Sequence, residues 1–307
     1  MFNKIRKKPQ EVSTHEKETT LNIIKREMLR DKVALSSFIF IAIVILFLTI
    51  GSLVIDQAEV LQRDFSLIGN NNQAPSINHI LGTDGGGRDG FRVLIIAARN
   101  SLVITILATL ISSVFGIIYG LISGYVGGRV DSFMMRIIEG ISILPNIVIL
   151  ITLIAVMGGV GVISIFTYTV MISLVAWLGI ARMVRTRLIQ EKELEYIQAS
   201  KTLGTPHIKI IFHQLLPNLS TIIIASMTLS AVSIIGMETG ISFLGFGFPI
   251  EMPSLGTLLA SARTPVVLRF RRWNWIPATV LITLIMFSIN NVGNMLSRAA
   301  DARQRRG

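Results

Sequence analysis

Long hydrophobic blocks alternate with shorter polar segments along this chain. The apolar blocks cover residues 33–55, 101–125, 133–157, 162–181, 219–237 and 276–296. Because an α-helix rises about 1.5 Å per residue, about 20 apolar residues cross a hydrocarbon layer of about 30 Å. The pattern therefore predicts an all-α membrane protein with six transmembrane helices.

The segments outside the apolar blocks complete this topology. Residues 1–32 are polar and of mixed charge, so we expect a cytoplasmic N-terminal tail. Residues 56–100 are rich in turn-forming Gly and Asn, and we expect them to form an external segment. The first apolar run starts too far from the N-terminus, is too long and lacks a small-residue cleavage site for a secretory signal. It is expected to remain as a span.

Composition and charge agree with a membrane protein. The chain is 51% hydrophobic and 15% charged, with a mean hydropathy of +0.64. The net charge of +11 does not indicate nucleic acid, because the basic residues flank apolar runs without interleaved aromatic residues. With six spans, the basic segments 1–32, 127–136, 182–209 and 298–307 all fall on one side. The positive-inside rule makes that side, and both termini, cytoplasmic.

Small residues recur in the second apolar run. Ser112, Gly116, Gly120 and Gly124 are four residues apart, so they lie on one face of a helix. Such a ridge lets two helix backbones approach closely within a membrane. We expect a helix-packing role here and favour it over a direct role in a pore.

The third apolar run contains Pro145, which predicts a kink. Loosened backbone is tolerated where it faces water or protein, so Pro145 and Asn146 are candidate residues of a transport pathway. Glu139 in the same run is either a paired interfacial carboxylate, the favoured interpretation, or a functional intramembrane charge. We expect a tight turn at residues 158–161, and we expect Glu238 to end the fifth span.

A polar island separates the fourth and fifth runs. Residues 191–203 have the composition of a short helix, which Gly204 should end because glycine adopts a positive φ without steric cost. A second short segment covers residues 207–216, and Pro217 suits the first turn of the next helix. The island is either a site for another protein or an ordinary basic helix at the membrane surface.

This island resembles the EAA loop of the permease subunits of ABC importers. The matching positions are Gln198, Ala199, Ser200, Gly204, Gln214, Leu216 and Pro217. The Ala, the Gly and the Leu-Pro end are kept, whereas Gln198, Ser200 and Gln214 replace the usual Glu, Ala and Ile. The resemblance implies a type I ABC importer permease fold, with residues 191–218 as the cytoplasmic coupling loop. It implies ATPase-coupling roles for Glu195, Gln198, Ala199, Ser200, Leu203, Gly204, Leu216 and Pro217.

Two further stretches resemble the oligopeptide and dipeptide subgroup of these permeases. The first is Leu-Gly-Thr-Asp at 81–84 and Arg-Asp-Gly at 88–90, followed by Arg92, Arg99, Ser101 and Leu102; the second covers residues 242–249 and 254–259. The glycines at 85–87 also suggest a phosphate or calcium loop, but no Gly-Lys-Ser/Thr follows and the acidic spacing does not match an EF-hand. In the tail, only Gly293, Leu296 and Asp301 are reminiscent of the family pattern.

The resemblance implies a permease core at residues 101–297 in a bacterial plasma membrane. The implied partners are a second homologous permease, two cytoplasmic ABC ATPases and an extracytoplasmic substrate-binding protein that delivers peptides. The chain has no Walker A sequence, so ATP and Mg would be bound by the partner ATPases, and we expect no catalytic residue, metal site or cofactor here.

Three alternatives remain open. The same architecture could import nickel or a metallophore, because the peptide branch includes such systems. A secondary transporter or channel would need ionisable residues in mid-membrane, and most charges here lie at span ends. An intramembrane enzyme is the third, but the four histidines form no metal-ligand pair at helical spacing and no Gly-x-Ser-x-Gly elbow occurs. The roles of Arg269, Arg271 and Arg272 are left open.

Overall fold

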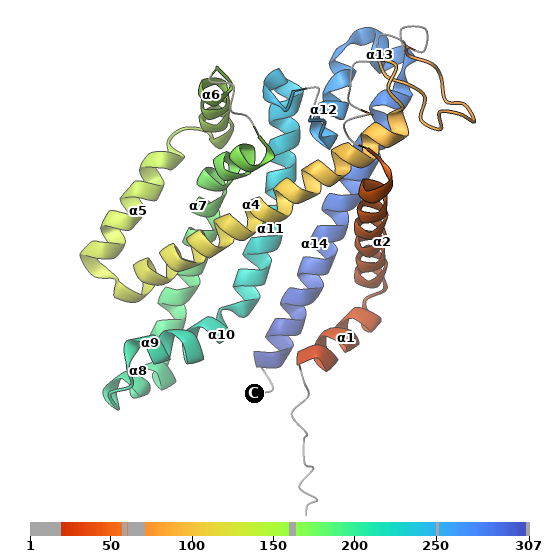
Figure 1. Cartoon of the computed structure of the whole chain (residues 1–307). Coiled ribbons are helices and arrows are strands. Elements are labelled where there is room, and N and C mark those ends of the chain that lie inside the picture. Colours follow the sequence, from red (N-terminus) through yellow and green to blue (C-terminus); the bar gives the residue numbers. More distant parts are fainter. Residues whose placement is uncertain (1–19, 57–59, 61–70, 160–163, 250–251, 305–307) are drawn as a thin grey trace, which may run out of the picture.

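The computed structural model describes residues 20–56, 60, 71–159, 164–249 and 252–304 (Figure 1). Within these residues the regular structure is helical, apart from an isolated bridge between Thr83 and Asp89. The longer helices are α1 (Thr20–Arg30), α2 (Lys32–Val54), α4 (Gly90–Val126), α5 (Gly128–Ser142), α6 (Asn146–Gly159), α7 (Ile165–Lys192), α11 (Ser220–Ile241) and α14 (Ile276–Gln304).

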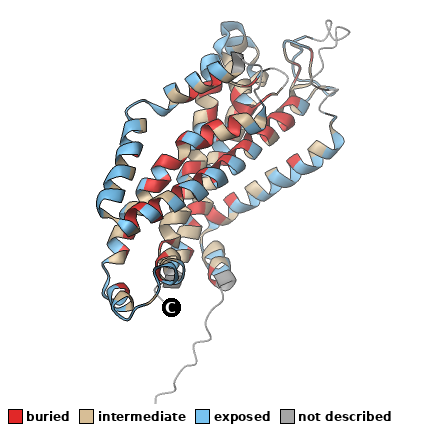
Figure 2. Cartoon of the chain, turned by 60° about the vertical axis from the view of Figure 1, so that its left-hand side comes forward, coloured by how far each residue is buried: buried red, intermediate tan, exposed pale blue. Residues whose placement is uncertain are grey.

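The predicted membrane topology is confirmed at the level of spans. Among the described residues, five helices are long and apolar enough to cross a membrane, and the bent pair α5 and α6 makes a sixth span if it is counted as one. Buried residues concentrate in α4 and α7, and α2 is mostly exposed (Figure 2). An apolar surface that is exposed in the isolated chain is expected for helices that face lipid.

Helix α4 begins at Gly90, well before the predicted start of the second span at Ser101. The last part of the segment 56–100 is therefore helical and continuous with the second span. Asp89 caps it, because its Oδ1 accepts hydrogen bonds from the N–H groups of Phe91 and Arg92, both at 3.0 Å. Val93, Ile96 and Ala97 are buried there, so packing stabilises turns that hydropathy alone did not assign to a helix.

The small residues of α4 lie against α7. A Cβ atom on Gly120 would stand 2.7 Å from the carbonyl oxygen of Ala181 and 2.9 Å from Cβ of Val184. Gly116 and Gly124 meet Ile180 and Leu188 in the same way, and Ser112 is buried. The two backbones therefore approach at a distance that only glycine permits.

The third span is broken rather than merely kinked. Helices α5 and α6 meet at an angle of 74° on either side of Pro145, which lacks an N–H and cannot continue a helical ladder. Gly158 and Gly159 end α6 instead of forming the predicted turn, and Gly161 lies outside the described residues. Helix α5 stands at the margin of the bundle (Figure 1).

Glu238 lies inside α11 and does not end it, which corrects the prediction. The helix continues to Ile241 and then into a π-helical turn, η3 (Ser242–Phe246). The Glu238 side chain is buried, and its Oε1 accepts hydrogen bonds from the Ser254 hydroxyl at 2.5 Å and the Ser242 hydroxyl at 3.1 Å. Ser254 caps the short helix α12 (Leu255–Ala260), so Glu238 ties α12 to α11.

We expect Glu238→Ala to lower the melting temperature of the purified protein in detergent, whereas Glu238→Gln should lower it much less. Alanine removes the acceptor for two buried hydroxyl groups, at a cost of about 1–3 kcal/mol, and glutamine keeps an acceptor oxygen. Thermal unfolding followed by size-exclusion chromatography measures the difference. Equal melting temperatures for the alanine variant and the parent would contradict this role.

The N- and C-terminal regions meet at one end of the bundle. Helix α14 continues through residues 298–304, which the sequence assigned to a basic tail, and α2 and α1 pack against it. Arg298 donates to the carboxylate of Asp31, which also caps α2 through the N–H groups of Val33 and Ala34. This end also carries the segment between α7 and α11, and we call it the α8 end (Figure 1).

Candidate coupling site

The polar island folds into short helices joined by a tight turn. Helix α8 (Glu195–Thr202) ends at Gly204, whose φ of 74° is in the left-handed region. The Gly204 N–H donates to the Lys201 carbonyl and the Thr205 N–H to the Ser200 carbonyl, both at 3.0 Å. This pair of bonds is a Schellman motif, so Gly204 ends the helix as its residue type predicts.

The rest of the island leads into α11 with little interruption. Helix α9 (His207–Ile210), a π-helical turn η2 (Ile211–Leu215) and helix α10 (Leu216–Asn218) follow in order. Pro217 lies in the first turn of α10, as predicted. The predicted helix at 191–203 is divided, because Glu191 and Lys192 end α7 and α8 starts separately.

Apolar anchors attach these short helices to the bundle. Ile197, Ile210, Leu215 and Leu219 are fully buried in one cluster. The same cluster contains Leu121 of α4 and Ile180, Val184 and Leu188 of α7. A displacement of α8 would therefore be transmitted to α7 and α11, because close-packed side chains pass strain to their neighbours.

Hydrogen bonds join the two halves of the island. Gln214 Nε2 donates to Ser200 Oγ at 3.0 Å, so two of the positions that depart from the EAA pattern bind each other. Asn218 Nδ2 donates to the Tyr196 hydroxyl. Burial, and then the nearby Glu191 carboxylate, raise the pKa of Tyr196, so its phenol stays protonated at neutral pH.

The island exposes several apolar side chains among its polar residues. Leu203 is 85% exposed, Ile208 71% and Phe212 58%, and Ala199 is also exposed. We call these four residues the docking face. Ala199 and Leu203 are among the residues for which the EAA resemblance implies a coupling role. Ile208 and Phe212 were not predicted, although their four-residue spacing within a polar segment was a usable signal. Exposed apolar patches mark contacts with other proteins or with a membrane, so these residues are candidates for such a contact.

The other predicted coupling residues are distributed around this face. Glu195, Gln198, Gly204 and Pro217 are exposed, whereas Ser200 and Leu216 are half-buried. Gln198 Nε2 donates to the Lys192 carbonyl at 2.8 Å, so it connects α8 to the end of α7. The structure thus brings the predicted residues into one compact region.

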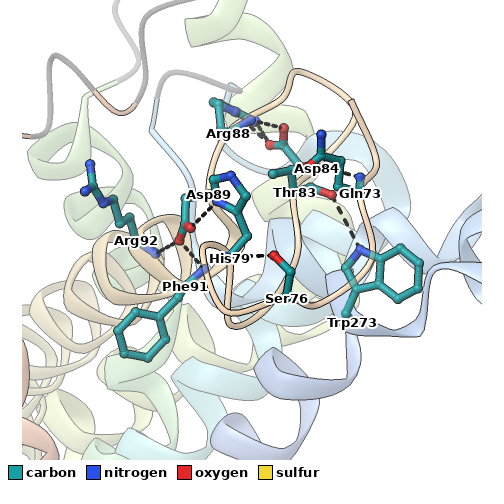
Figure 3. A network of polar contacts seen from close by, with 10 residues as sticks. All are labelled: Gln73, Ser76, His79, Thr83, Asp84, Arg88, Asp89, Phe91, Arg92 and Trp273. Atoms are coloured by element: carbon teal, nitrogen blue, oxygen red, sulfur yellow. Dashed lines mark hydrogen bonds and ion pairs between the residues drawn. The ribbon is translucent and has the colours of Figure 1, made fainter. Parts of the chain in front are cut away.

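At the opposite end of the bundle, the loop before α4 is held by its own side chains (Figure 3). Asp84 accepts hydrogen bonds from the N–H groups of Gly86 and Arg88, and it pairs with the Arg88 guanidinium. Asp89 caps α4 and contacts Nδ1 of His79 at 2.8 Å. These acidic residues therefore stabilise the loop through local contacts.

Close approach of other segments explains the glycines of this loop. A Cβ on Gly82 would stand 2.4 Å from the Gln73 carbonyl oxygen and 2.8 Å from the Trp273 ring, and one on Gly90 would stand 2.7 Å from the Leu81 carbonyl oxygen.

Arg271, whose role the sequence left open, donates to Asn72 Oδ1 at 2.8 Å. A cavity of about 730 Å³ opens between this loop and helices α12, α13 (Pro265–Phe270) and α14.

Pro145 and Asn146 lie apart from both of these regions. They occupy the break between α5 and α6, and both are exposed. Their position agrees with the predicted interruption of the helix at Pro145. It does not place them next to the coupling loop.

Comparison with known proteins assigns the family. The profile of "Binding-protein-dependent transport system inner membrane component" matches residues 116–306. The chain is 41% identical to the oligopeptide transport system permease protein OppC of Lactococcus lactis subsp. cremoris (strain SK11), over 92% of this chain and 94% of the relative. It is 36% identical to the dipeptide transport system permease protein DppC of Bacillus subtilis (strain 168), over 92% and 85%.

The fold has a counterpart among solved structures. A chain of the MetNI methionine ABC transporter in an inward-facing conformation is similar to it with a TM-score of 0.59 and 19% identity, over 68% of this chain and 97% of that chain. The type I importer permease fold implied by the loop is therefore confirmed. The family profile and the two peptide permeases show that this chain is a multi-pass membrane protein of the binding-protein-dependent transport system inner membrane component family, in its oligopeptide and dipeptide permease branch.

Proposed function

We propose that this chain is a permease subunit of an ATP-driven importer and carries oligopeptides or dipeptides across the membrane. The observation that supports this best is its identity of 41–42% with two oligopeptide permeases over more than nine-tenths of the chain. The chain itself supplies the path and no chemical step. ATP and Mg are bound by ABC ATPases on the cytoplasmic side, where the α8 end and both termini lie.

The coupling loop converts ATPase motion into movement of spans. The ATPases bind the docking face, and their closure displaces α8. Ile197 transmits this displacement to α7, and Leu215 and Leu219 transmit it to α11. A second, homologous permease completes the path, which runs past Pro145 and Asn146, and an extracytoplasmic binding protein delivers the peptide to the opposite end. Gated access of this kind needs rigid elements with two arrangements.

Uptake by the purified complex in proteoliposomes tests this function. We expect accumulation of a labelled peptide only when the binding protein is outside and ATP is supplied to the ATPases. Nickel or a metal chelate accumulating instead would favour the metal-importing alternative. Uptake that continues without ATP hydrolysis would favour a secondary transporter or channel.

Leu203→Asp should weaken the binding of the ATPases about thirtyfold, because a central apolar contact of a protein interface contributes about 2 kcal/mol or more. The expected result is loss of ATPase subunits from the complex during purification in mild detergent. Ile77→Asp is a matched control, since Ile77 is 100% exposed at the opposite end of the bundle. Retention of the ATPases by the Leu203 variant would contradict the assignment of the docking face.

A further inference from the structure

A charged cavity of about 490 Å³ lies between α5 and α7, in the half of the bundle toward the α8 end. Its polar lining consists mainly of Asp131, Arg136, Glu139, Arg182, Arg185 and Thr186. Four of these charged residues belong to the segments 127–136 and 182–209 at the ends of spans, and Glu139 lies one turn further along α5.

Two of these charges neutralise each other. Arg185 makes two hydrogen bonds to the Asp131 carboxylate, both at 2.5 Å, and Ser123 also donates to Asp131. This bidentate pair connects α7 to the start of α5. It forms a fixed wall of the cavity, with its donors and acceptors engaged.

The remaining charges are available to a ligand. Arg136, Glu139 and Arg182 are exposed. Arg182 donates to the Ser142 hydroxyl. In the part of the chain that the structure describes, Arg136 and Glu139 form no hydrogen bond or salt bridge, although Glu139 acts on Arg185 electrostatically. The cavity therefore offers two guanidinium groups and one carboxylate.

These groups lie toward the inner ends of the third and fourth spans. Arg182 is 17 residues after Ile165, the first residue of α7, which places it about 26 Å along the helix at about 1.5 Å per residue. That distance is close to the full hydrocarbon thickness of about 30 Å, so the cavity lies near the inner mouth of a path through the membrane. Charged side chains at the inner end of a span can face water, and a broken span such as α5 and α6 usually lines a polar path.

We propose that this cavity is a binding site on the transport path for the two ends of a peptide main chain. Arg136 and Arg182 bind the terminal carboxylate, and Glu139 binds the terminal ammonium group. The inference rests on the function proposed above. A guanidinium group presents paired N–H donors that match a carboxylate, and Glu139 supplies the acceptor for an ammonium group.

This arrangement explains how one path can accept many peptides. Linear peptides with free ends share one carboxylate and one ammonium group, whereas their side chains differ in size and charge. A site that contacts only the ends is therefore insensitive to peptide sequence. The cavity volume lies in the range of sites for small molecules, about 300–1,000 Å³.

The test compares ATP-driven uptake of a tripeptide with its C-terminally amidated and N-terminally acetylated forms in proteoliposomes that contain the full complex. Arg182→Gln should lower uptake of the free peptide about tenfold, since a hydrogen bond to a charged group contributes about 1.5–3 kcal/mol. Uptake of the amidated peptide should change less than twofold. Glu139→Gln should lower uptake of the free peptide in the same way and spare the acetylated peptide.

Arg129→Gln is the matched control, because Arg129 is an exposed residue of α5 outside the cavity and the substitution removes the same charge. The ratio of free to blocked peptide uptake should then equal that of the parent. Each complex is first checked for bound ATPases and for basal ATP hydrolysis. If Arg182→Gln does not assemble, Arg136→Gln is expected to give the same selective loss.

The outcomes separate this inference from the proposed function. If the parent complex takes up no peptide, the proposed function fails. If the parent takes up peptide but the Arg182 and Glu139 variants reduce free and blocked peptides equally, or reduce neither, the cavity is not a site for peptide ends and the proposed function stands. The ratio of free to blocked peptide uptake is compared between each variant and the parent. The binding protein is the same in every preparation, so its own preference for free peptide ends cancels in this comparison.

Discussion

Gly204→Val is expected to abolish peptide uptake while the protein still inserts and reaches normal levels in the membrane. Gly204 has a φ of 74°, and a β-branched residue in this conformation costs about 1–2 kcal/mol or more. A Cβ at this position would have no neighbouring atom within 4 Å, so the strain is in the backbone and not in a clash. The chain relieves it by breaking the Schellman motif, which moves Leu203 relative to Pro206.

Two measurements check this result: uptake of a labelled peptide by cells, and the amount of protein in isolated membranes. Gly204→Asn is the control, because asparagine tolerates the left-handed conformation and is found at the same position of helix ends. We expect it to retain most of the uptake. Normal uptake in the valine variant at an equal membrane level would show that the turn does not transmit the motion of the ATPases.

Gly120→Val should destabilise the fold itself. Its Cβ would stand 2.7 Å from the Ala181 carbonyl oxygen, and backbone cannot move aside as the end of a flexible side chain can. Forcing extra atoms into a packed interface costs about 1–3 kcal/mol, and separating α4 from α7 also disturbs the cluster that anchors the coupling loop. We expect a lower melting temperature in detergent and less folded protein in the membrane.

The matched control for this variant is Gly179→Val. Gly179 is exposed on α7, and a Cβ there would meet no atom within 4 Å, so the same substitution tests helix propensity without the clash. Thermal unfolding monitored by size-exclusion chromatography compares the two. A melting temperature for Gly120→Val equal to that of Gly179→Val would contradict the close contact between α4 and α7.

Local signals were sufficient for the spans and for the coupling loop. Span membership depends on the hydropathy of about 20 consecutive residues, which the sequence displays directly. The end of α8 depends on the residue type at Gly204, and the start of α10 on Pro217, so both were predictable without knowledge of their surroundings. The break at Pro145 was also predictable from residue type alone. The angle of 74° between α5 and α6 was not.

The start of α4 and the position of Glu238 could not be predicted in this way. Residues 90–100 contain polar side chains and were placed in the segment before the second span, but a cap from Asp89 and burial of Val93 and Ile96 make them helical. Glu238 was predicted to end the fifth span, and an unpaired charge in hydrocarbon would indeed be costly. Ser242 and Ser254 supply the hydrogen bonds that permit its burial, and Ser254 comes from a different helix.

Hydropathy and residue type therefore specified which segments cross the membrane and where the coupling loop turns, because those properties depend on neighbours along the chain. The orientation of side chains was decided by contacts between distant segments. The exposure of Ile208 and Phe212 follows from the burial of Ile197 and Ile210 against α7, and the gathering of Arg136, Glu139 and Arg182 around one cavity follows from the placement of α5 beside α7. Side-chain periodicity defines the faces of a helix, but only the helix packed against it selects the face that is buried.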